Sequence, residues 1–259
     1  MGINKKLTAK QIAILILLYR FRFLNRLQIQ QFLKHKHSSR VNTWLKYLTE
    51  NNYLGRIYYR EFGKNTIPAV YFLKSKSAGV LKEEKGVNKP LLNRIYREHL
   101  RSDKFITHCL FLADIYFHLD RLCQKSKAEL HFFNRTDLAE YNYLPEPLPD
   151  LYFVINETKE ITKRYFLEMY GQKTPRYALR HRIFRFFNYY FSNVWEKTTA
   201  HPFPTILLVC SDKYMQGYLN KFIQETMEEE DNYEINFFTT TVGKIRKEGV
   251  GKDVWAAVS

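Results

Sequence analysis

The sequence predicts an α/β (α+β) fold in two parts: a small domain of helices and a β-hairpin, then a larger α/β domain with a central mixed sheet. In the first 85 residues, apolar positions recur at helical spacing and then give way to two short strand-like runs. The later residues alternate helical segments with short apolar runs, the pattern of an α/β domain. Gly and Pro number only 10 and 8 in 259 residues, which argues against disorder.

Domain boundaries follow from changes in composition. The polar, charge-dense run at residues 77–88 marks the end of the first domain. We expect a first domain at residues 1–85, a connecting segment at 86–102, an α/β domain at 103–242 and a basic, partly ordered tail at 243–259.

Two capping boxes predict the starts of the first two helices. Thr8 stands three residues before Gln11, and Asn25 stands three residues before Gln28. At this spacing the first side chain accepts from the backbone of the second residue, and the Gln side chain reaches back to the first. The two helices that follow should bury apolar residues such as Leu15 and Ile29.

A third helix is expected over residues 38–53, capped by Ser38 or Ser39. Its apolar stripe at i, i+3, i+4 and i+7 comprises Val41, Trp44, Leu45 and Leu48. The opposite face carries hydroxyl, amide and basic groups, which are the types that contact base edges and phosphates. These residues are Ser39, Arg40, Asn42, Thr43 and Lys46.

A β-hairpin should follow the third helix, with Gly55 supplying a positive φ at the helix end. Residues 56–61 and 68–73 read as its two strands, joined by a turn at 62–66. Three helices followed by a hairpin is the order of a winged helix domain, whose third helix enters the major groove. Arg60 and Lys64 would then lie on the wing and hold the DNA backbone.

The distribution of charge indicates a polyanionic partner for the first domain. Residues 1–85 hold 17 lysine and arginine residues against 4 acidic ones, a net charge of +13 of the +15 total. A membrane surface is the competing polyanion, but the basic residues are spread over several elements and do not line one amphipathic helix. Double-stranded DNA is therefore the expected partner, and its binding requires no cofactor.

The sequence favours a cytoplasmic protein without a membrane partner. Its longest apolar run, residues 12–19, is too short to span a bilayer, and no signal peptide is evident. The cysteines at 109, 123 and 210 are widely spaced and odd in number, which is typical of reduced core residues.

A pair of carboxylates in the second domain is the candidate for chemistry. Asp150 precedes a predicted strand at 151–156, and Glu168 lies in the next strand, at 164–170. If the strands form a hairpin, both carboxylates meet at one end of the sheet, where many nucleases hold Mg²⁺ beside the scissile phosphate. The alternative is that the pair caps the sheet or pairs with the arginine-rich helix expected at 176–195.

The element order and the Pro149-Asp150…Glu168 spacing resemble the PD-(D/E)XK nuclease core. That family completes its site with an acid-x-Lys triplet, whereas this chain has Glu168-Met169-Tyr170. The resemblance implies a restriction-endonuclease-like fold and leaves a Mg²⁺-dependent activity open. Lys173 or Arg180 could supply the missing positive charge.

Most of the chain, from Leu7 to Phe238, resembles the replication-relaxation family of plasmids and other mobile elements of Gram-positive bacteria. The resemblance implies a DNA-binding protein needed for plasmid replication or plasmid DNA relaxation. The residues that carry it are Leu7–Ile12, Tyr19–Phe23, Arg40–Leu45, Asn52–Leu54, Tyr71–Leu73, His108, Pro149–Asp150, Phe166–Glu168 and the aromatic helix ending at Trp195.

Two hypotheses follow, with different roles for the second domain. In the first, the protein binds DNA at an origin or promoter without cutting it, and Arg176 and Arg180 add phosphate contacts. In the second, it is an endonuclease or nickase that uses Asp150 and Glu168. A transcriptional regulator and a tyrosine relaxase are further alternatives, although no clustered His pair is present to hold the relaxase metal. A homodimer and replication or mobilisation proteins are the expected protein partners.

Overall fold

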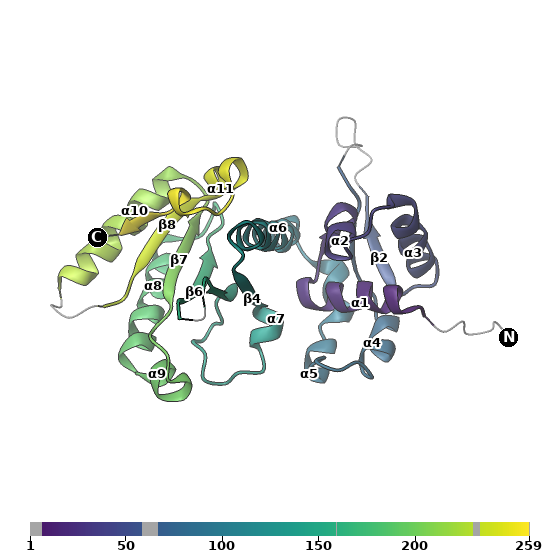
Figure 1. Ribbon diagram of the computed structural model, residues 1–259, viewed down its shortest axis with the longest axis horizontal. Coiled ribbons are helices and arrows are strands. Elements are labelled where there is room, and N and C mark those ends of the chain that lie inside the picture. Colours follow the sequence, from purple (N-terminus) through teal and green to yellow (C-terminus); the bar gives the residue numbers. More distant parts are fainter. Residues whose placement is uncertain (1–6, 59–66, 159, 230–233, 259) are drawn as a thin grey trace. The chain divides into compact units, whose positions relative to one another are not determined.

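The computed structural model describes residues 7–58, 67–158, 160–229 and 234–258 (Figure 1). The chain divides into two compact units, Met1–Asp114 (unit 1) and Ile115–Ser259 (unit 2). The division falls inside helix α6 (Asp103–Ser126) and not in the expected link. The residues around that link instead form three short helices that belong to unit 1, namely α4 (Lys76–Leu81), α5 (Lys89–Leu92) and η1 (Ile95–Leu100).

Unit 1 combines helices with a three-stranded antiparallel sheet of order β1-β3-β2. The expected helices are present, and a strand pair overlaps the expected hairpin, although residues 59–66, with the end of the first expected strand and the turn at 62–66, lie outside the described residues. Strand β1, of two residues, is an addition that the sequence did not indicate. The elements are α1 (Ala9–Phe21), β1 (Leu24–Asn25), α2 (Arg26–Phe32), α3 (Ser38–Glu50), β2 (Leu54–Ile57) and β3 (Val70–Leu73).

Both predicted capping boxes are confirmed. The Thr8 and Asn25 side chains accept hydrogen bonds from the backbone amides of Gln11 and Gln28. In return, the side-chain oxygen of each Gln accepts a hydrogen bond from the backbone amide of the N-cap residue. The expected serine cap of α3 is wrong. That helix begins one residue earlier than a serine cap requires, so its N-cap is His37, which makes no side-chain capping bond.

Gly55 has a different role from the one expected. The left-handed residue after α3 is Asn52, with φ of 62°. Gly55 instead lies in β2 opposite Phe72, where an added Cβ would come within 2.1 Å of the Phe72 ring. The glycine is therefore required for close packing of the aromatic ring, and Asn52 supplies the turn.

Unit 2 is built on a six-stranded mixed sheet of order β4-β5-β6-β7-β8-β9. The β6–β7 and β7–β8 pairs are parallel and the other three pairs are antiparallel. Its strands are β4 (Glu129–Asn134), β5 (Leu151–Asn156), β6 (Thr162–Met169), β7 (Thr205–Cys210), β8 (Phe237–Thr241) and β9 (Ala256–Val258). The mixed α/β fold class predicted from the sequence is confirmed.

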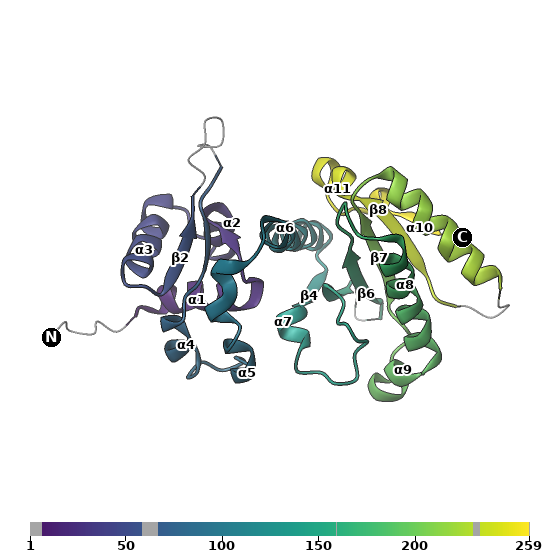
Figure 2. The ribbon, with the colours of Figure 1, turned by 180° about the vertical axis from the view of Figure 1, so that it is seen from behind.

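Helices α8 (Arg176–Phe191) and α10 (Lys213–Glu228) cover one face of this sheet, as Figures 1 and 2 show. Leu179 and Ile183 of α8 and Leu219 of α10 pack with Phe166 and Leu208 of the sheet in one buried cluster. The helix expected at 176–195 is interrupted, because α8 ends at Phe191 and Asn193, with φ of 52°, precedes a separate α9 (Val194–Thr199).

Residues 243–258 differ from the expected partly ordered tail. They contribute helix α11 (Val242–Glu248), the turn η2 (Lys252–Val254) and strand β9, which pairs with β8. The short helix α7 (Arg135–Leu138) is a further addition, and it positions a residue of the carboxylate site described below.

Candidate nucleic-acid interface and carboxylate site

Helix α3 presents a polar face to solvent in unit 1. Its buried side is Val41, Leu45 and Leu48, as the helical spacing predicted, and Trp44 is half-buried. The five residues predicted to contact DNA from this helix are all exposed, namely Ser39, Arg40, Asn42, Thr43 and Lys46.

A groove of about 520 Å³ lies between α3, the start of α2 and the β2–β3 pair. Asn42, Thr43 and Lys46 line it, whereas Ser39 and Arg40 lie outside it on the first turn of α3. The other lining residues are Arg26, Thr49, Arg56, Tyr58, Ile67, Pro68, Ala69 and Tyr71.

The groove carries three cations and no acidic residue among those that line it. The cations are Arg26, Lys46 and Arg56. Burial raises the pKa of Tyr71, which pairs across the strands with Arg56, and the charges of Arg56 and Arg26 lower it in part. The phenol therefore stays neutral at pH 7, and the groove keeps a net positive charge.

Sequence reasoning missed two of these cations. Arg26 lies at the groove because it directly follows β1, which pairs with β3. The backbone amide of Arg26 donates a 3.1 Å hydrogen bond to the Ala69 carbonyl. Arg56 faces the groove from β2 beside Tyr71. The wing residues predicted from the sequence, Arg60 and Lys64, lie outside the described residues.

In unit 2 the predicted hairpin brings the two carboxylates together. β5 and β6 pair antiparallel, with Leu151 opposite Leu167. Asp150, at the start of β5, accepts a 2.8 Å hydrogen bond through Oδ2 from the backbone amide of Met169. Asp150 is 1% exposed and Glu168 is 0% exposed, so both carboxylates are removed from water.

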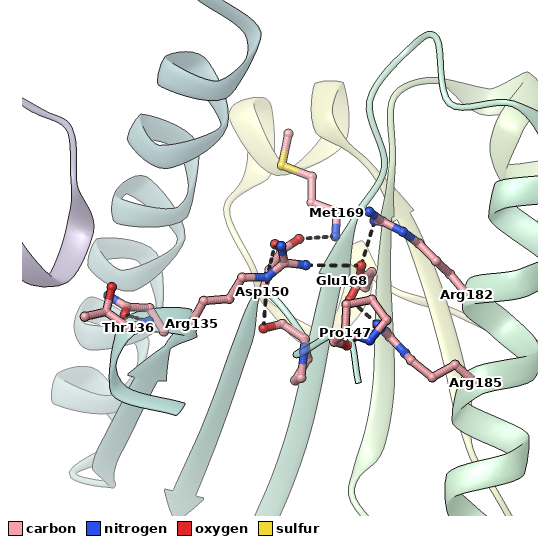
Figure 3. Close-up of polar contacts among 10 residues, drawn as sticks. Arg135, Thr136, Pro147, Asp150, Glu168, Met169, Arg182 and Arg185 are labelled. Atoms are coloured by element: carbon pink, nitrogen blue, oxygen red, sulfur yellow. Dashed lines mark hydrogen bonds and ion pairs between the residues drawn. The ribbon is translucent and has the colours of Figure 1, made fainter. Parts of the chain in front are cut away.

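Three arginines surround these carboxylates, as Figure 3 shows. Arg135 bridges the pair, with Nε 3.2 Å from Asp150 Oδ1 and Nη2 3.6 Å from Glu168 Oε1. From α8, Arg182 Nη1 lies 2.7 Å from Glu168 Oε1 and Arg185 Nη2 lies 3.1 Å from Glu168 Oε2. Arg185 also donates to the Pro147 carbonyl. The two negative charges are thus matched by three positive ones.

This arrangement does not fit a Mg²⁺ ion between Asp150 and Glu168. The oxygens that would coordinate the metal accept hydrogen bonds or contact guanidinium groups, and those groups would repel a divalent cation. In the part of the chain that the structure describes, no cluster of three or more His, Cys, Asp or Glu side chains could hold a metal. Burial and the neighbouring Asp150 raise the pKa of Glu168, and the three arginines oppose that rise.

Tyr170 occupies the place of the lysine in the nuclease-like triplet. Its side chain is on the same face of the sheet as Glu168, two residues earlier, and it is buried in the core beside α8. The Arg182 guanidinium lies 5.8 Å from the Tyr170 ring centroid. The Tyr170 hydroxyl has no hydrogen-bond partner among the described residues, so it does not supply the charge that a lysine would.

The family comparison covers both of these sites. A family model described as replication-relaxation matches residues 15–202, more than half of the chain. The chain belongs to the replication-relaxation family. No curated protein and no solved structure matches it. The part matched by the replication-relaxation model includes α3, the groove and the carboxylate site, and it ends before β7.

Arg176 and Arg180, predicted as phosphate contacts, lie apart from the carboxylate pair in this replication-relaxation protein. Both are exposed on the first half of α8 and contact aromatic side chains of α10. Arg176 donates to the Tyr214 hydroxyl, and Arg180 Nε donates to the Tyr218 hydroxyl over 2.7 Å. The other two arginines of α8, Arg182 and Arg185, form the salt bridges to Glu168.

Proposed function

We propose that the protein binds double-stranded DNA of a plasmid or other mobile element through the groove of unit 1. The observation that carries this proposal is the groove itself, in which Arg26, Lys46 and Arg56 lie beside the hydroxyl and amide groups of α3. Cations bind phosphates and fix the protein on the duplex, while hydroxyl and amide groups read base edges.

The order of elements supports a winged-helix mode of binding. Helices α1, α2 and α3 precede the β2–β3 pair, and α3 has one buried and one exposed polar face. In this mode α3 enters the major groove, where Asn42 and Thr43 face the bases and Lys46 binds a phosphate. Arg56 contacts the neighbouring backbone of the duplex.

Membership of the replication-relaxation family supports a role in the replication or relaxation of such an element. The partners that fit this role are DNA, replication or mobilisation proteins, and a second copy of the chain. Among the described residues no helix is both long and apolar enough to cross a membrane.

The test is a DNA-binding measurement by fluorescence anisotropy on a duplex from the protein's own plasmid. Lys46→Ala combined with Arg56→Ala should weaken binding at least tenfold, because two phosphate or base contacts are lost. The matched control is Lys82→Ala with Lys85→Ala, which removes the same charge from exposed positions outside the groove. Equal losses in both double variants would show that net charge, and not the groove, determines binding.

The nuclease hypothesis has less support from the geometry. The Asp150–Glu168 pair is closed by salt bridges to Arg135, Arg182 and Arg185, and Tyr170 replaces the lysine. We therefore propose that this pair stabilises unit 2, and that the protein acts on DNA by binding it.

A further inference from the structure

Two stripes of side chains face each other across α8 and α10. Arg176, Arg180 and Phe184 recur every four residues on α8, and Tyr214, Tyr218 and Phe222 do so on α10. Residues four apart lie on one face of a helix. The contacts pair the stripes in register, with Arg176 at Tyr214, Arg180 at Tyr218 and Phe184 at Phe222, each pair 38 residues apart. We call these six residues the arginine–aromatic ladder.

Within the ladder, cations lie over aromatic rings. The Arg176 guanidinium is 4.9 Å from the Tyr218 ring centroid, and the Arg180 guanidinium is 5.1 Å from that of Phe222. The Phe184 and Phe222 rings meet edge to face at 5.4 Å. These contacts hold the arginines at the surface in fixed positions, with the guanidinium groups close to the rings.

Part of the ladder is exposed to solvent, whereas Tyr218 and Phe222 are half-buried and pack against the core beneath it. Tyr214 is 74% exposed, and Tyr177, one residue after Arg176 on α8, is 77% exposed. If the ladder served only to join the two helices, burial of Tyr214 would also be expected, because burial is what makes aromatic packing favourable. The core beneath it, with Leu179, Ile183 and Leu219, already joins α8 to α10.

The charge around the ladder is positive. Helix α8 has four arginines and no acidic residue. Lys173 precedes α8 and Lys213 begins α10, and both are exposed. Glu225 and Glu228 are exposed at the other end of α10, and the exposed N-cap Asp212 is the acidic residue near Tyr214. Lys173, Lys213 and the two arginines of the ladder outnumber this one carboxylate.

We propose that the arginine–aromatic ladder with Tyr177 is a binding surface for single-stranded DNA. The exposed rings of Tyr177 and Tyr214 offer π-faces on which unpaired bases stack, and the arginines bind the phosphates between them. Bases within a duplex are already stacked on each other, so this surface selects an unpaired strand. The stripe from Arg176 to Phe184 extends about 12 Å along α8 at 1.5 Å per residue, which matches a short run of nucleotides.

This surface gives unit 2 a role in the proposed function. Replication and relaxation both pass through an unpaired strand, and the groove of unit 1 is the proposed site for a duplex. The inference rests on DNA being the ligand of the protein, but it uses none of the residues of the groove. Loss of one activity therefore need not entail loss of the other.

The experiment measures binding of the full-length protein to three fluorescein-labelled probes. They are a 20-nucleotide oligothymidine, a 20-base-pair duplex, and a 20-nucleotide strand with abasic sites in place of bases. Tyr177→Ala with Tyr214→Ala should weaken binding of oligothymidine about 100-fold, at about tenfold for each ring. Binding of the duplex should change less than threefold, and the abasic strand should bind wild type about as weakly as the variant binds oligothymidine.

Two further variants separate stacking from folding and from general surface effects. Tyr177→Leu with Tyr214→Leu retains apolar bulk and helix propensity but has no π-face, so it should lose binding like the alanine variant. Tyr96→Ala with Tyr141→Ala removes two exposed tyrosines outside the ladder and should bind oligothymidine like wild type.

The outcome that overturns the inference is equal binding of oligothymidine by wild type and by the Tyr177 and Tyr214 variants. Equal binding of the abasic and base-containing strands by wild type would also overturn it, because phosphate contacts alone would then suffice. The Lys46→Ala and Arg56→Ala variant serves as the reverse control. It should lose duplex binding and keep oligothymidine binding, so that failure at the groove and failure at the ladder are told apart.

Discussion

Arg185 and Glu168 form a buried ion pair, with Nη2 3.1 Å from Oε2 and side chains that are 6% and 0% exposed. The pair joins α8 to strand β6, and Arg185 extends it to the loop before β5 by donating to the Pro147 carbonyl. Arg182 and Arg135 reach the other oxygen of Glu168. One carboxylate therefore connects α7, α8 and the sheet.

Removing one partner of this pair should destabilise unit 2. We expect Arg185→Met to lower the free energy of unfolding by about 3 kcal/mol, because Glu168 keeps its buried charge with one fewer guanidinium. Glu168→Gln should also destabilise. The double variant should lose less free energy of unfolding than the two single variants lose together. We expect this difference, the coupling energy, to be about 1–3 kcal/mol when measured by urea denaturation. Strictly additive costs would show that the two groups do not interact.

The Tyr170 hydroxyl is the opposite case, because it is a buried polar group whose removal should not destabilise the protein. It has no hydrogen-bond partner among the described residues, and burial raises the pKa of Tyr170 well above its usual value. Tyr170→Phe keeps the ring, so the variant should be as stable as wild type or up to about 1 kcal/mol more stable. A loss of stability in urea denaturation would mean that the hydroxyl makes a bond in solution.

Salt dependence provides a quantitative test of the groove. Each cation that neutralises a phosphate releases a counterion, and the logarithm of the binding constant then falls linearly with the logarithm of salt concentration. We expect Arg26→Ala, Lys46→Ala and Arg56→Ala each to reduce the steepness of this line by about 0.9 on duplex DNA. The control Lys82→Ala should leave the slope unchanged. If a substitution lowers the affinity but leaves the salt dependence unchanged, the replaced residue contacts bases and not phosphates.

The arginines at the carboxylate pair predict that supercoiled plasmid stays intact. Wild type and Asp150→Asn, incubated with plasmid and Mg²⁺ or Mn²⁺, should both leave it supercoiled on an agarose gel, because Arg135 and Arg182 occupy the approach to the carboxylates. A commercial nicking enzyme in the same buffer is the positive control. Nicking by wild type that disappears in Asp150→Asn would establish a nuclease and contradict the binding-only function.

Local signals in the sequence predicted local structure well. The capping boxes at Thr8 and Asn25 are present, and the strand at 151–156 begins and ends at the predicted residues. These signals depend on neighbours a few residues apart, so one sequence suffices to read them. The meeting of Asp150 and Glu168 was also predictable, because a hairpin joins consecutive strands.

Contacts between distant segments were harder to predict. Arg135 reaches Asp150 from α7, a helix of four residues that the apolar pattern does not indicate. A signal for it does exist, since Asn134 and Asp137 form a capping box at its start. Arg26 lines the groove because the two residues of β1 pair with β3, and so short a strand has no recognisable pattern.

The crowding of cations around Glu168 also constrains how the site could be engineered. Tyr170→Lys would restore the acid-x-Lys triplet of the nuclease pattern, but it would bury a further cation close to Arg182 and Arg185. That substitution alone should destabilise unit 2 and still leave no place for a metal. The order of mutations therefore matters: the arginines must be replaced first, and a lysine at position 170 becomes tolerable only afterwards.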